Sequence, residues 1–194
     1  MANVDSTTSA RPEFTHPAFQ DIFPPEFGEI PVEVLLSRPL HGGLDFLALA
    51  PACAELVAEL LETRSTTARL ALAGRLMLAV GLLKAATQGE LTEQQRDALT
   101  VDAHPGEAAT DHEPVFESES DTLADYCHLL AVVLLSRTLA PQQEKTIAGL
   151  LFELVNFLRD SLTAPRFFRS PDGLRCIDDG SLFSQGDGHE HSAA

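Results

Sequence analysis

Tryptophan is absent from this chain of 194 residues, and tyrosine occurs once, as Tyr126. Hydrophobic residues make up 44% of the chain, and leucine and alanine supply most of them. Both favour helix over sheet, whereas tryptophan and tyrosine, which are enriched in strands, are scarce. The length suits one domain with flexible ends. The composition therefore predicts a single all-α core.

Cysteine is also rare: Cys53, Cys127 and Cys176 are widely separated and form no ligand-like pair such as Cys-x-x-Cys. An odd number without such spacing argues against a disulfide framework and against a zinc motif. Cys53 and Cys127 lie within apolar helical patterns, where cysteine behaves as a small buried hydrophobe. A reducing compartment is the default for such a chain, so we expect a cytoplasmic protein.

Basic residues are few, with 13 lysines and arginines against 29 acids and a net charge of −16. That balance disfavours nucleic acid and anionic membrane surfaces as partners. The first 14 residues contain no apolar segment of the kind found in secretory signals. The longest apolar run, residues 70–83, includes Arg75 and is shorter than the roughly 20 residues of a membrane span.

The negative charge is concentrated outside the apolar segments. Residues 97–136 carry −9 because no lysine or arginine lies between Arg96 and Arg137, whereas residues 44–96 carry −1. We therefore expect a nearly neutral helical core with acidic segments outside it.

Three regions follow from the pattern: an irregular arm over residues 1–43, a helical bundle over 44–164, and a hairpin with a polar tail over 165–194. Six prolines interrupt the arm, although residues 32–36 suit a short strand or a turn of helix. Residues 101–120 predict an acidic loop inside the bundle. The expected fold is an all-α bundle of four to five helices with a small C-terminal β-hairpin.

Apolar residues at three- and four-residue spacing predict four long helices and one short helix. Pro51 leaves open whether the first helix starts near residue 44 or near Ala50. The second is apolar almost all round, which is typical of a central helix, and its small residues would let another helix approach closely. Thr92 and Gln95 suit a capping box at the start of the short helix. The expected ranges are 44–63, 66–88, 92–100, 121–139 and 141–164.

The hairpin is predicted by two short β-prone segments, residues 166–169 and 174–177, on either side of a Pro-Asp-Gly turn. Phe167 and Phe168 either pack on the bundle or contact a partner.

No motif for catalysis stands out. A Gly-x-Ser-x-Gly elbow and a glycine-rich phosphate loop are both missing from the sequence. Asp125 and His128 lie one helical turn apart, but helical di-metal proteins use Glu-x-x-His twice with two further carboxylates. His residues near Asp111 and in the C-terminal tail lie in segments unsuited to fixed geometry. We predict no catalytic residue, no metal and no cofactor.

The arm holds four of the eleven phenylalanines, and exposed phenylalanine is unfavourable unless something covers it. Either the arm folds back over its own bundle, or its rings insert into a groove of a partner or of a second copy. The residues concerned are Phe14, Phe19, Phe23 and Phe27.

The central acids also allow two interpretations: a solvated loop that maintains solubility, or a surface complementary to a basic partner. We take Asp111, Glu113, Glu117 and Glu119 as candidate partner-binding residues. The expected function is that of a non-enzymatic, acidic, cytoplasmic protein that binds another protein as an adaptor, assembly chaperone or inhibitor. The alternative is a helical enzyme, or an accessory subunit of one, with a metal or small-ligand site inside the bundle near His128. A homodimer is compatible with both.

Overall fold

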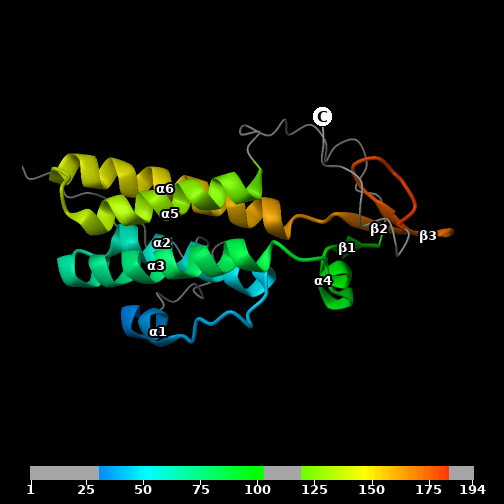
Figure 1. Ribbon diagram of the computed structural model, residues 1–194, viewed down its shortest axis with the longest axis horizontal. Coiled ribbons are helices and arrows are strands. Elements are labelled where there is room, and N and C mark those ends of the chain that lie inside the picture. Colours follow the sequence, from blue (N-terminus) through cyan, green and yellow to red (C-terminus); the bar gives the residue numbers. More distant parts are fainter. Residues whose placement is uncertain (1–30, 103–118, 184–194) are drawn as a thin grey trace, which may run out of the picture. The chain divides into compact units, whose positions relative to one another are not determined.

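The structure, a computed structural model, describes residues 31–102 and 119–183. The chain divides into two units, Met1–Pro31 and Val32–Ala194, and the described helices and strands all belong to the second. The predicted all-α fold with a small hairpin is confirmed (Figure 1). The helices are α1 (Val32–Ser37), α2 (Phe46–Glu62), α3 (Thr66–Ala86), α4 (Glu93–Ala98), α5 (Ser120–Ser136) and α6 (Pro141–Thr163).

The four long helices form an antiparallel bundle in which each packs against two neighbours. Helix α2 contacts α3 and α6, and α5 contacts the same two helices. The pairs α2–α5 and α3–α6 are therefore the diagonals. Short connections between α2 and α3, and between α5 and α6, suit such an up-down arrangement.

Leucine, alanine and valine fill the core, as the spacing predicted. Cys53 and Cys127 are also buried, with at most 1% of either residue exposed. The largest side chains with under 2% exposure come from all four long helices and from the segment after α4; they are Leu49, Val57, Leu60, Leu72, Leu76, Val80, Leu83, Leu99, Leu123, Leu151, Val155 and Leu158.

Helix α2 begins at Phe46, so the alternative start near Ala50 is wrong. The Asp45 carboxylate caps the helix by accepting a hydrogen bond of 2.8 Å from the backbone N–H of Ala48. Pro51 lies inside the helix. It has no backbone N–H, so the hydrogen bond to the carbonyl four residues earlier is lost. A strong cap and a buried face together outweigh that loss.

Helix α3 is not central, contrary to the sequence-based expectation. It packs against α2 and α5, and also against α1, where Arg75 Nε donates a 2.9 Å hydrogen bond to the carbonyl of Leu35. Its remaining side is open, where Leu78 is 49% exposed and Gly81 is also exposed. The stripe of small residues lies on this open side instead of at a contact within the bundle. Within the described part of the chain, α3 is also the one helix long and apolar enough to cross a membrane, with a mean hydropathy of 1.4.

The helix ends follow the expected signals with one exception. Thr92 and Gln95 form the predicted capping box of α4, and Pro141 is the first residue of α6. At the start of α5, however, the N-cap is Glu119, and its side chain makes no capping hydrogen bond. Helix α5 ends at Ser136, and its C-cap residue Arg137 has a left-handed backbone with a φ of 54°.

The hairpin carries one strand more than the sequence predicted. Strands β2 (Phe167–Ser170) and β3 (Gly173–Cys176) pair antiparallel, with Phe168 opposite Arg175. Gly173 takes a φ of 129°, which the turn requires and which favours glycine. Strand β1 (Thr100–Val101) then pairs in parallel with β2, so residue 101, the predicted first residue of the acidic loop, belongs to a strand. Residues 103–118 of that predicted loop lie outside the described residues.

The short sheet is fixed to the bundle through the segment that follows α4. The backbone N–H groups of Arg166 and Phe167 both donate to the carbonyl of Leu99, at 2.9 and 3.1 Å. Phe167 and Phe168 are buried at 6% and 9% exposure, so this pair packs on its own chain. The sheet therefore continues one end of the bundle, where the ends of α3, α5 and α6 meet.

Candidate functional site

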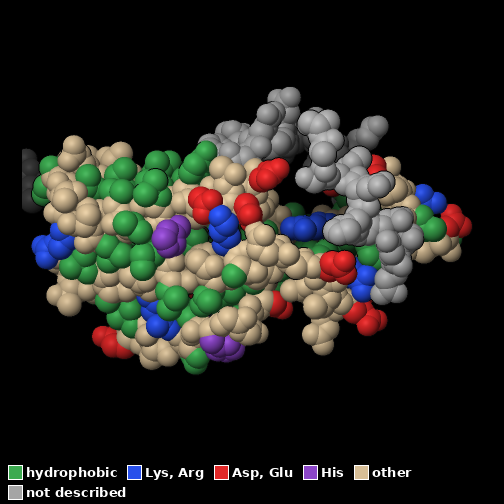
Figure 2. All heavy atoms as spheres, in the orientation of Figure 1, with side chains coloured by type: hydrophobic (Ala, Val, Ile, Leu, Met, Phe, Trp, Pro, Cys, Tyr) green, Lys and Arg blue, Asp and Glu red, His purple; other side chains and the backbone are tan. Residues whose placement is uncertain are grey.

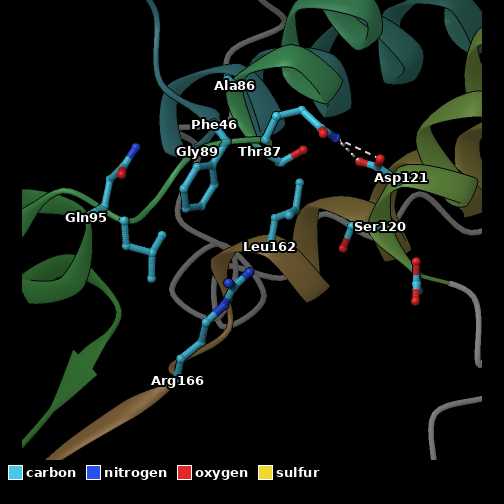
Figure 3. A pocket seen from close by; sticks show the side chains of 12 residues that line it. Phe46, Ala86, Thr87, Gly89, Gln95, Ser120, Asp121, Leu162 and Arg166 are labelled. Carbon is cyan, nitrogen blue, oxygen red and sulfur yellow. Dashed lines mark hydrogen bonds between the residues drawn. The ribbon is translucent and has the colours of Figure 1, made fainter. Parts of the chain in front are cut away.

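A cavity of about 420 Å³ lies at the end of the bundle that carries the sheet (Figure 3). Its wall comes from the start of α2, the end of α3, the segment before α4, the start of α5 and the end of α6. The lining residues are Phe46, Ala86, Thr87, Gln88, Gly89, Leu91, Gln95, Glu119, Ser120, Asp121, Leu162 and Arg166.

One wall is fixed by a contact between α3 and α5. The Gln88 side-chain amide donates to both carboxylate oxygens of Asp121, at 2.8 and 2.7 Å. Asp121 lies in the first turn of α5, where the helix dipole stabilises a negative charge. Residues just beyond α3 are therefore tied to the first turn of α5, and the Asp121 carboxylate is held at the cavity.

The opposite wall carries a guanidinium next to an aromatic ring. Arg166 lies over the ring of Phe46, with 6.0 Å from its central carbon to the ring centroid. Its backbone is fixed on both sides, because its N–H donates to Leu99 and its carbonyl accepts from Ile177 at 2.9 Å. Figure 3 shows the Arg166 side chain directed toward Leu162 and the space beside Phe46.

Glu119 is the one predicted binding residue that the structure describes. It is exposed, lines the cavity, and stands beside Ser120 and Asp121 at the start of α5. The remaining seven candidates lie outside the described residues: Phe14, Phe19, Phe23, Phe27, Asp111, Glu113 and Glu117.

Acidic side chains surround the cavity and extend over the sheet (Figure 2). We call this region the sheet-end surface; it contains nine acids and four arginines. The acids are Glu90, Glu93, Asp97, Asp102, Glu119, Asp121, Asp172, Asp178 and Asp179, and the arginines are Arg96, Arg166, Arg169 and Arg175.

Three of these arginines are already occupied. Arg169 lies 3.5 Å from Asp97 and 3.9 Å from Asp102, and Arg175 lies 3.4 Å from Asp172. Arg96 lies over the ring of Phe183, 5.1 Å from its centroid. Even if each of the four arginines neutralised one acid, five of the nine acids would remain, so the local potential of the sheet-end surface is negative.

His128 and Asp125 stand on the outside of the bundle. Both are exposed, and both Asp125 oxygens accept a hydrogen bond from the Lys84 amine at 2.6 Å. This bond raises the pKa of Lys84 above its usual value. Within residues 31–102 and 119–183, no group of three or more His, Cys, Asp or Glu side chains has the arrangement to hold a metal ion.

The buried thiols are unsuited to nucleophilic chemistry. Burial raises the pKa of both Cys53 and Cys127 to about 12, with a smaller contribution to Cys53 from Cys127. A thiol with that pKa is almost entirely protonated at neutral pH, and the thiolate is the reactive form.

Comparison of the chain with protein-family models, with curated proteins and with solved structures found no match. The fold and the site therefore define the class on their own. The protein is an antiparallel four-helix bundle with a short three-stranded sheet at one end and an acidic cavity beside that sheet.

Proposed function

We propose that the protein binds a basic segment of another protein at the sheet-end surface, as a non-enzymatic adaptor, assembly chaperone or inhibitor in the cytoplasm. The observation that carries this proposal is the position of Glu119 and Asp121 at a cavity of about 420 Å³. The two carboxylates suit the charged head of a lysine or arginine side chain.

The surrounding charge supports a basic partner. Arg169 and Arg175 already neutralise acids within the sheet-end surface, so an incoming cation meets carboxylates that have no bound counterion. Negative potential over such a surface accelerates association with a positive partner and is screened by salt. Each exposed ion pair contributes only about 0–1 kcal/mol, so useful affinity requires several contacts at once.

The N-terminal phenylalanines form the second part of the proposal. Phe14, Phe19, Phe23 and Phe27 would supply aromatic anchors to a groove on the partner, as aromatic residues do at many interfaces. Acids would then orient the partner, and the rings would contribute most of the binding free energy.

One observation favours the alternative of an enzyme, or an enzyme subunit, with a small ligand. The cavity volume lies within the roughly 300–1,000 Å³ of ligand sites, and Arg166 offers a cation to an anionic group. Stoichiometric metal or an organic molecule in purified protein, detected by elemental analysis and native mass spectrometry, would support this alternative over a protein partner.

The proposal is tested by calorimetric titration with an oligolysine peptide. We expect the double variant Glu119→Gln, Asp121→Asn to bind it about tenfold more weakly, because two carboxylates at the cavity are lost. The matched control is Glu62→Gln, Glu153→Gln, which removes two exposed acids from other parts of α2 and α6. An equal loss in both double variants would mean that only the total charge matters, and would overturn the site.

The native partner is then sought by affinity purification at low salt with mass spectrometry. We expect a basic protein that is released by salt and that is lost with Phe19→Ala or Phe23→Ala. If no protein is retained at low salt, the adaptor proposal is wrong.

A further inference from the structure

An apolar face on the open side of α3 and α5 has no partner among the described residues. We call it the α3–α5 face; Leu78, Leu129 and Val132 on it are 49%, 60% and 39% exposed. Figure 2 shows hydrophobic side chains gathered over these two helices. Its apolar and small members are Ala71, Gly74, Leu78, Gly81 and Ala85 on α3, and Leu129 and Val132 on α5. Lys84, Asp125 and His128 line the groove between the two helices beside Gly81.

The register between α3 and α5 fixes which residues lie level with each other. Lys84 bonds to Asp125, Gln88 bonds to Asp121, and a side chain at position 74 would lie 3.9 Å from Leu135. In each pair the two residue numbers add up to 209, as they do in an antiparallel pair of constant register. Position 78 is therefore level with residue 131, which lies between Leu129 and Val132 in the sequence.

The face is symmetric about Leu78. On α3, Gly74 and Gly81 lie four and three residues from it, and Ala71 and Ala85 each lie seven residues from it. A rotation of 180° about an axis through Leu78 would place alanine opposite alanine, and would bring each glycine within one residue, about 1.5 Å along the helix, of the other glycine. Such self-complementarity is what a two-fold interface between identical chains requires.

Gly81 is unexplained within a single copy. A Cβ atom added at this position meets no atom within 4 Å, so nothing in the described part of the chain requires glycine there. Glycine inside a helix costs roughly 1 kcal/mol relative to alanine. A close approach by a second backbone would account for the glycine, because only glycine leaves room for it.

The charges are also complementary under the same rotation. The small and apolar residues of α3 on this face are uncharged, and the Asp125 carboxylate at its edge is already paired with Lys84, so two strongly acidic copies can meet there without unpaired carboxylates facing each other. Asp125 and Arg137 lie level with positions 84 and 72, six residues on either side of Leu78. The rotation places Asp125 of each copy opposite Arg137 of the other, and both residues are exposed.

We propose that the α3–α5 face is the interface of a two-fold homodimer, in which α3 of one copy packs antiparallel on α3 of the other about Leu78. The interface is separate from the sheet-end surface and does not depend on the function proposed for it. Its occupant is a second copy of this chain.

The first test compares two leucines of matched exposure. Leu78→Asp places two carboxylates at the two-fold axis, whereas Leu150→Asp changes a residue 47% exposed on α6, diagonally across the bundle from α3. Sedimentation velocity over a concentration series should give twice the 20.9 kDa mass for the full chain and for Leu150→Asp. Leu78→Asp should weaken the association at least tenfold. A full chain that is monomeric throughout, or equal loss in both variants, would overturn the proposal.

A charge exchange tests the geometry with variants whose substitutions are on the surface. Arg137→Asp should weaken the dimer several-fold, and adding Asp125→Arg should restore it, because each new pair again joins opposite charges. Lys145→Glu, a change of like size on α6, serves as the control and should have no effect. If the double variant associates no better than Arg137→Asp alone, the proposed register is wrong.

A cysteine cross-link locates the axis and remains informative where Leu78→Asp fails to fold. In a Cys176→Ser background, Leu78→Cys should form a disulfide-linked dimer under mild oxidation, because the two substituted positions meet at the axis. Leu150→Cys should not. Flotation of the full chain, but not of Leu78→Asp, with phosphatidylcholine–phosphatidylglycerol vesicles would instead assign the face to a membrane and overturn the dimer.

Discussion

At the scale of single residues, the sequence predicts burial better than it predicts contacts. Cys53 and Cys127 lie in apolar periodic segments and are buried as expected. Arg166 and Phe46, in contrast, belong to segments 120 residues apart, and no local pattern indicates that a guanidinium would lie over that ring. Tertiary pairing of this kind depends on where helix ends meet, and that information is not carried by either segment alone.

The two buried thiols make stability sensitive to alkaline pH. Each has a pKa of about 12 in the folded chain, against the 9.0 of an exposed thiol, so the folded state binds these protons more tightly. The stabilisation is complete below pH 9 and is lost as the pH rises toward 12. Between pH 8 and pH 10 we expect a loss of about 1.4 kcal/mol per thiol.

Urea unfolding at the two pH values measures this loss. Tyrosine and lysine also titrate in alkali, so the informative quantity is the difference between the full chain and Cys127→Ala. The variant should lose less stability between the two pH values, by about 1.4 kcal/mol. Identical pH dependence in both proteins would mean that the Cys127 thiol is not desolvated by the core.

At the scale of secondary structure, the extents of the long helices were predicted closely, but the orientation toward the core was predicted only for helices with a polar side. Helices α2 and α6 have an apolar stripe with acids opposite, which also orients them toward the core. Helix α3 is apolar almost all round, so its sequence gives its extent but not its orientation. Strand β1 has two residues, too few for an alternating pattern, and it forms because Phe167 and Phe168 offer a strand beside it.

The capping box of α4 is expected to support the cavity. The Thr92 hydroxyl accepts a hydrogen bond from the Gln95 N–H at 3.2 Å, and the Gln95 side-chain carbonyl oxygen accepts one from the Thr92 N–H at 2.9 Å. Thr92→Ala should lower the free energy of unfolding by about 1 kcal/mol, as measured by urea denaturation. Thr67→Ala, an exposed change in the first turn of α3 that leaves the Ser65–Ala68 capping hydrogen bond in place, is the control.

The same variant links the helix to the binding site. Because Gln95 lines the cavity and is 8% exposed, a frayed α4 would loosen that wall. Thr92→Ala should therefore also weaken oligolysine binding, whereas Thr67→Ala should not. Weakened stability with unchanged binding would show that α4 contributes to the fold but not to the site.

At the scale of the whole molecule, charge separates the two interfaces. The sequence predicts a neutral helical core with acids outside it, and the described acids of the sheet-end surface are placed accordingly. What the sequence could not provide is the division of the surface into an acidic end and a mainly apolar α3–α5 face. That division arises from the register of α3 against α5, which long-range contacts set.

Opposite responses to salt should follow from this division. Binding of oligolysine at the sheet-end surface depends on attraction between exposed charges, which salt screens, so its affinity should fall as salt is raised. Self-association through the α3–α5 face depends mainly on apolar burial, and it brings together two copies that each carry −16. Screening reduces their repulsion by more than it weakens the two exposed Asp125–Arg137 pairs, because each pair contributes only about 0–1 kcal/mol.

Raising sodium chloride from about 0.05 to about 0.5 M shortens the Debye length from roughly 14 to roughly 4 Å, so both effects fall within one accessible range. Calorimetry should show weaker oligolysine binding at the higher concentration, and sedimentation should show equal or tighter self-association. Leu78→Asp should retain the first response while it lacks the second. If both affinities fell in parallel, the two interfaces would not be distinct, and the α3–α5 contact would be electrostatic instead of apolar.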